Sequence, residues 1–147
     1  MPRSRRFADD GGSASLEFLT VGLILLVPTV YLVLAVSTIQ AAAFAVEGAA
    51  RQAARVFVQA PDLASAEASA ERALAFALAD HGIEESAQLT VSCQPAACLT
   101  RQAFVTVSVD LDVPLPLVPP VLVGDFPLAV PLHATATAQV SRFWGAG

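Results

Sequence analysis

Residues 18–39 carry no charged side chain, and most of them are large and apolar. As an α-helix this stretch is roughly 33 Å long, because each residue adds 1.5 Å, and that length crosses the hydrocarbon core of a bilayer. A helix that is apolar on every side needs either a large surrounding core or a membrane. A chain of 147 residues cannot supply such a core and also fold its remainder. The stretch therefore predicts one transmembrane helix.

The arginines on either side of this stretch indicate its orientation. Arg3, Arg5 and Arg6 precede it, and the next basic residue is Arg51. The positive-inside rule places the N-terminus in the cytoplasm and the rest of the chain outside, as a single-pass protein of the cytoplasmic membrane. The alternative is a secretory signal cleaved near Ala43, but the apolar part of such a signal spans only about 7–15 residues.

Glu17 stands at the edge of the apolar stretch, where a carboxylate is costly and calls for a partner. In one interpretation it is simply solvated among lipid headgroups. In the other, the chain is cut after Gly12, which gives Ser13 a new terminal ammonium. Glu17 is then one helical turn from that ammonium. It can pair with its own terminus or with that of a neighbouring subunit.

Residues 12–18 read Gly-Ser-Ala-Ser-Leu-Glu-Phe, a motif that resembles the processing site of type IV pilin-like precursors. The short leader and the glutamate–aromatic pair resemble the Flp/Tad (tight adherence) branch. Major Flp pilins usually carry tyrosine where this chain has Phe18, and they end soon after their helix, whereas this chain continues to residue 147. The chain is therefore most similar to the TadE-like minor pilins or pseudopilins, which carry a small exported domain.

This resemblance implies a set of partners and roles. A prepilin peptidase would cut between Gly12 and Ser13. Glu17 and Phe18 would serve assembly with other pilin or pseudopilin subunits and with the Tad inner-membrane assembly platform. The processed protein would then be incorporated in a pilus at the cell surface or assist its assembly. Pro28 removes a backbone hydrogen bond and should kink the helix; the resemblance implies that this bend fits packed neighbours, and the alternative is a tolerated membrane proline.

Beyond the membrane stretch, the pattern predicts more helix and then a break. Helical periodicity continues over residues 40–59. Pro61 and Asp62 interrupt it, and Asp62 is suited to cap the N-terminus of the next helix. Apolar residues at spacings of three and four then predict a second helix over residues 63–80, and Gly82 ends it.

Three later segments alternate apolar and polar residues and predict strands over residues 89–93, 105–113 and 132–140. The first two should form a hairpin, and the alanine-rich third should pack closely on a helix. We thus expect an α+β fold, in which the long N-terminal helix continues into a domain with a second helix and a three-stranded antiparallel sheet. The expected boundaries are a leader over 1–12, a helix over 13–60 and an exported domain over 61–147.

Cys93 and Cys98 enclose four residues. Outside the cytoplasm such a close pair predicts a disulfide that closes the hairpin loop. A zinc site would need two further ligands at suitable spacing, and a redox motif would separate the thiols by two residues.

Residues 114–131 hold six of the ten prolines together with several large apolar side chains. Prolines disfavour regular strand pairing. The segment either folds back over the sheet or is exposed as a docking surface, and the sequence leaves both open. If it is exposed, its candidate contact residues are Leu117, Val118, Val121, Leu122 and Phe126.

Composition and motifs argue against several classes of function. The formal net charge is −5, whereas nucleic-acid binding needs clustered basic residues. No catalytic triad, phosphate-binding glycine loop or metal-ligand set is recognisable. We therefore expect no enzyme activity, cofactor, metal or small-molecule substrate. The rival to a pilin subunit is a single-pass membrane protein with an accessory or binding domain that is not cleaved at Gly12.

Overall fold

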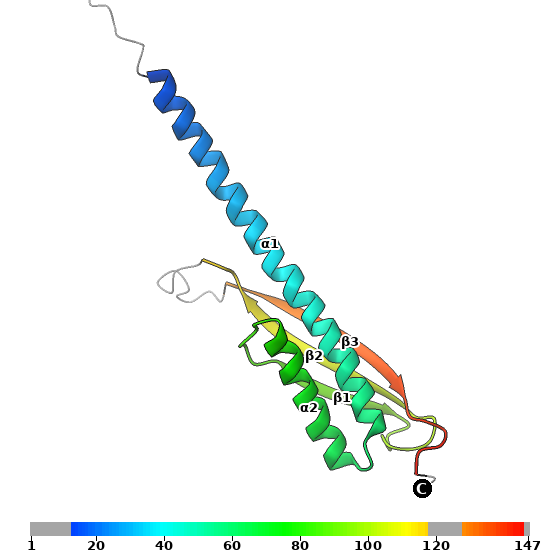
Figure 1. Ribbon diagram of the computed structural model, residues 1–147. Coiled ribbons are helices and arrows are strands. Elements are labelled where there is room, and N and C mark those ends of the chain that lie inside the picture. The colour runs from blue at the N-terminus through cyan, green and yellow to red at the C-terminus, as the bar shows by residue number, and fades with distance from the viewer. Residues whose placement is uncertain (1–12, 118–127, 146–147) are drawn as a thin grey trace, which may run out of the picture. The chain divides into compact units, whose positions relative to one another are not determined.

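The structure is a computed structural model that describes residues 13–117 and 128–145. It confirms the predicted α+β fold, a long N-terminal helix, a second helix and a three-stranded antiparallel sheet (Figure 1). The elements are α1 (Ser13–Gln59), α2 (Leu63–Asp80), β1 (Gln88–Gln94), β2 (Phe104–Pro114) and β3 (Ala129–Gln139). The chain divides into two compact units, Met1–Val36 and Ser37–Gly147, with the boundary inside α1.

In the first unit, the part of α1 up to Val36 presents most of its large apolar side chains outward. Leu16, Leu25 and Val33, for example, are each more than 60% exposed. A helix with this pattern has no core of its own to bury them. By length and composition, α1 is long and apolar enough to span a membrane, and it is the one such helix among the described residues.

In the second unit, α1 and α2 cover the same face of the sheet, as Figure 1 shows. The core between helices and sheet is built from small residues on α1 and branched residues on β2. Phe57 is its largest fully buried side chain. The alanines permit a close approach of helix and sheet, and burial of this apolar surface is the main stabilising term. The α1 residues that contribute are Ala42, Ala45, Val46, Ala49, Ala50, Ala53, Ala54 and Phe57, and Ala60 just beyond the helix joins them.

The ends of α2 are capped as the sequence predicts. The carboxylate of Asp62 accepts a hydrogen bond from the backbone N–H of Ser65 at 2.9 Å. At the other end, Gly82 has φ = 67°, a left-handed conformation that glycine adopts without strain. The N–H groups of Gly82 and Ile83 donate to the carbonyls of Ala79 and Leu78, which ends the helix.

The three strands lie in the order β1-β2-β3 and pair antiparallel. Alternate residues of β2, from Val105 to Val113, are buried under the helices, and those between them face away from the helices. This confirms the predicted hairpin and the period of two.

The third strand begins three residues earlier than we predicted, because Pro131 pairs opposite Asp112 within the ladder. β3 is an edge strand bonded on one side only, so a residue without an N–H is tolerated there.

Candidate functional site

The N-terminal turns of α1 hold the residues that the sequence singled out for assembly. Ser13 is already helical, whereas Gly12 lies outside the described residues. Glu17 and Phe18 follow one turn later, and both are exposed. Within residues 13–117 and 128–145, Glu17 has no ion-pair partner. The carboxylate is therefore available to a cation from outside the described chain.

Pro28 lies inside α1, and the helix is continuous on both sides of it. Proline has no N–H to donate to the carbonyl four residues earlier. Two threonines along this helix bond back to their own turns, Thr20 Oγ1 to the Leu16 carbonyl and Thr29 Oγ1 to the Leu25 carbonyl, both at 2.7 Å. Such back-bonding satisfies the hydroxyl without water, as an apolar environment requires. The predicted kink at Pro28 stays a prediction.

The cysteine pair forms the predicted disulfide. Cys93 Sγ and Cys98 Sγ are bonded at 2.02 Å, and the bridge closes the turn that follows β1. Both cysteines pack against the edge of the core. The bridge therefore ties the connection between β1 and β2 covalently to the end of β1.

A turn over residues 141–145 is fixed to the rest of the second unit. Trp144 Nε1 donates to the carbonyl of Ala60 at 3.0 Å, and Arg101 Nε donates to the carbonyl of Trp144 at 3.1 Å. Next to it, the Arg142 guanidinium lies 4.7 Å from the centre of the Phe143 ring. Arg142 and Phe143 are both exposed. The two hydrogen bonds of Trp144 were not predicted from the sequence because they join residues 84 and 43 positions apart and follow no local pattern.

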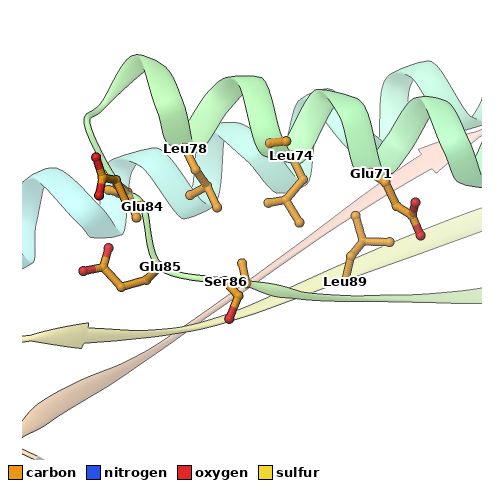
Figure 2. Close-up of a pocket in the computed structure, with 10 residues that line it drawn as sticks. Glu71, Leu74, Leu78, Glu84, Glu85, Ser86 and Leu89 are labelled. Atoms are coloured by element: carbon orange, nitrogen blue, oxygen red, sulfur yellow. The ribbon is translucent and has the colours of Figure 1, made fainter.

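A groove of about 430 Å³ lies between the second half of α2, the segment after it and the start of β1. Figure 2 shows Leu74 and Leu78 of α2 facing Leu89 of β1 across it. Three glutamates also line it, Glu71 from α2 and Glu84 and Glu85 from the following segment. We call this the acidic groove. An apolar floor with carboxylates at its margin suits a ligand that is both apolar and cationic.

The face of the sheet away from the helices is polar. Asp110 Oδ1 and His133 Nδ1 lie 2.7 Å apart on neighbouring strands, and the hydroxyls of Thr106 and Thr137 lie 2.9 Å apart. All four side chains belong to exposed or half-exposed residues, so solvation accounts for them. No cluster of three potential metal ligands occurs in the described part of the chain.

The predicted contact loop is only partly described. Leu117 is 75% exposed, whereas Val118, Val121, Leu122 and Phe126 lie outside the described residues. The Leu115 N–H donates to the Leu128 carbonyl at 3.0 Å and holds the two ends of the segment together. Whether the segment between them is a docking surface stays a prediction.

Comparison with known proteins adds no relative. No protein-family model, curated protein or solved structure matches this chain.

Proposed function

We propose that this chain is a minor pilin or pseudopilin of a Flp/Tad-type system, processed after Gly12 and assembled through its N-terminal helix. One observation carries the proposal. A single helix, α1, presents unburied apolar side chains over its first half and supplies the core of a folded domain with its second half. A helix of this kind can hold a subunit in a membrane with its first half and carry the subunit's folded domain on its second half.

The carboxylate of Glu17 supports the same proposal. Glu17 follows Ser13 by one helical turn and has no cationic partner in the described residues. After cleavage, the Ser13 ammonium of a neighbouring subunit would neutralise it within a bundle of like helices. An unpaired charge inside an apolar bundle costs about 2.5–3.5 kcal/mol, so the pairing would favour one axial register between neighbours.

The remaining features complete the proposed assignment. The arginines of residues 1–12 would keep the leader in the cytoplasm and the second unit outside. The disulfide at Cys93 suits an oxidising compartment. Partners would be the prepilin peptidase, other pilin or pseudopilin subunits and the Tad assembly platform, and the subunit would act without catalysis of its own.

The proposal is tested by co-expressing the full chain with a prepilin peptidase of a Flp/Tad system in a host that lacks one. We expect a shortened product that appears only with active peptidase and disappears when Gly12 is changed to valine. Gly22→Val, a change inside α1 where an added side chain meets no neighbour in the described structure, is the matched control and should be processed normally. A product that is unchanged by the peptidase would favour the uncleaved membrane-anchored alternative.

A further inference from the structure

Among the residues that the structure describes, the acidic groove has no cationic partner. None of Glu71, Glu84 and Glu85 forms an ion pair with any residue of the described ranges 13–117 and 128–145. In Figure 2, Glu84 and Glu85 lie toward one end of the groove and Glu71 toward the other, with the leucines between them. The groove thus offers an apolar contact between two sources of negative charge. Its volume falls within the range of about 300–1,000 Å³ seen for ligand sites.

The same molecule displays a side-chain pair whose chemistry complements that of the groove, one side chain basic and the other aromatic. Arg142 and Phe143, which we call the basic tip, stand together on the turn at 141–145. Phe143 is 68% exposed, so its ring is accessible to a partner. The turn is held by the bonds of Trp144 to Ala60 and of Arg101 to Trp144. A pre-positioned aromatic and an arginine are typical anchors of protein interfaces.

The basic tip and the acidic groove lie toward opposite ends of the second unit. The tip is bonded to Ala60, just beyond the Gln59 end of α1. The groove shares Ile83 and Glu85 with a neighbouring cavity that is lined by Ser37 and Ala41, near the start of this unit. Residues 37 and 59 are separated by roughly 33 Å along a helix. The tip is therefore placed to meet the groove of another molecule and not its own.

We propose that the basic tip of one copy docks into the acidic groove of a second copy of this chain. The Phe143 ring would cover the leucine floor, and the Arg142 guanidinium would bind the carboxylates of Glu84 and Glu85. Because tip and groove are different surfaces, the contact is heterologous and can repeat from one copy to the next. The inference rests on the proposed function, since it gives the exported domains of an assembling subunit a head-to-tail contact.

Three of the four other arginines of the second unit already have a hydrogen-bond partner. Arg51 is engaged by Glu47 at 3.3 Å on the same helix face, and Arg72 donates to Ser69 at 3.2 Å. Arg101 donates to the Trp144 carbonyl. Arg142 is the one arginine that stacks on an exposed aromatic ring in the described part of the chain. The pair therefore offers a positive charge to the glutamates of the groove and an apolar ring to its leucine floor.

The test places the photo-crosslinking residue p-benzoylphenylalanine at position 143 of the full-length chain, in membranes that contain two differently tagged copies. We expect a cross-linked product carrying both tags, with the link mapped to a peptide that includes residues 71–89. Arg142→Glu should lower its yield about tenfold or more, as the loss of an interface anchor does. Combining Arg142→Glu with Glu84→Arg and Glu85→Arg should restore the yield, because the charges are exchanged and still complementary. Arg55→Glu changes an exposed arginine on α1, outside the tip and the groove, and should leave the yield unchanged.

Two results would overturn the docking proposal: links only to other proteins or to lipid, or a two-tag product that is indifferent to the charge of residue 142. The mass of the mature N-terminus, measured on the same samples, reports separately on the proposed function. A chain that begins at Ser13 but shows no tip-to-groove link leaves the pilin proposal standing and removes the docking. A chain that keeps residues 1–12 but gives the link leaves the docking standing and removes the pilin proposal.

Discussion

Asp62 accepts a hydrogen bond from the Ser65 N–H and thereby begins α2. That bond, followed by a second from the Ser65 side chain, holds the pKa of Asp62 below its usual value of 3.8. Because the folded state binds this proton less tightly than the unfolded state, the stabilisation is complete above the unfolded pKa and is lost as pH falls through the folded pKa.

We therefore predict that Asp62→Asn removes part of the acid sensitivity of the fold while keeping the cap. Urea unfolding of the full chain in detergent, compared between pH 6 and pH 2.5, should show a smaller loss of stability for Asp62→Asn than for the natural chain. Asp62→Ala, which removes the acceptor altogether, should lower the melting temperature by about 5 °C at neutral pH. Equal acid sensitivity of the natural chain and Asp62→Asn would show that the carboxylate carries no such linkage.

Glu17 is the residue on which the proposed register between subunits depends. Glu17→Gln keeps the shape of the side chain but removes its charge, so the Ser13 ammonium of a neighbour would stay unpaired among apolar helices. We predict normal cleavage after Gly12 but at least a tenfold lower content of the variant in sheared pilus fractions or assembly complexes. The matched control is Glu47→Gln, at an exposed glutamate further along the same helix, which should assemble normally. Normal assembly of Glu17→Gln would contradict the pairing.

At the scale of elements, α1 has two different kinds of surface, and its two phenylalanines beyond residue 39 distinguish them. Phe57 is completely buried between helix and sheet, whereas Phe44 is 69% exposed. We predict that Phe57→Ala destabilises the second unit by about 3–5 kcal/mol, because it removes apolar contacts and leaves a cavity. Phe44→Ala should change the free energy of unfolding by less than about 0.5 kcal/mol. Urea unfolding in detergent measures both, and similar losses for the two variants would show that Phe57 does not lie in a core between helix and sheet.

The disulfide ties the connection between β1 and β2. Since it closes a loop with a sequence separation of only 5, the entropy model gives a contribution of about 2 kcal/mol. We predict that Cys93→Ser with Cys98→Ser lowers the unfolding free energy by about this amount, and that a thiol reductant then has no further effect. A double variant as stable as the oxidised natural chain would mean that the bridge does not stabilise the fold.

Local patterns predicted the elements well because their causes are local. The bounds of α2 follow from the Asp62 cap, the apolar spacing and Gly82, and the strands follow from alternation with a period of two. The start of β3 did not follow from its local sequence, because Pro131 is tolerated within a strand only if that strand lies at an edge of the sheet. Strand order is a tertiary property that the residues around a proline do not reveal.

At the scale of the whole molecule, the parts that sequence reasoning missed are those made by distant segments. Glu71, Glu84 and Glu85 read as separate surface charges in the sequence, and they share one groove only because β1 returns beneath α2. Likewise, Trp144 is fixed by Ala60, and no periodicity connects the two. The candidate assembly residues Gly12, Ser13 and Glu17 come from one local sequence motif, and their role in assembly stays a prediction.

In the proposed function, α1 becomes the N-terminal helix of a processed pilin-like subunit. The most direct test of this proposal is the intact mass and N-terminal sequence of the protein isolated from membranes of its own host. We predict a chain that begins at Ser13, with Glu17 as its fifth residue and the whole of α1 retained. A chain that still carries residues 1–12, or one that begins near Ala43 and lacks the apolar helix, would contradict it.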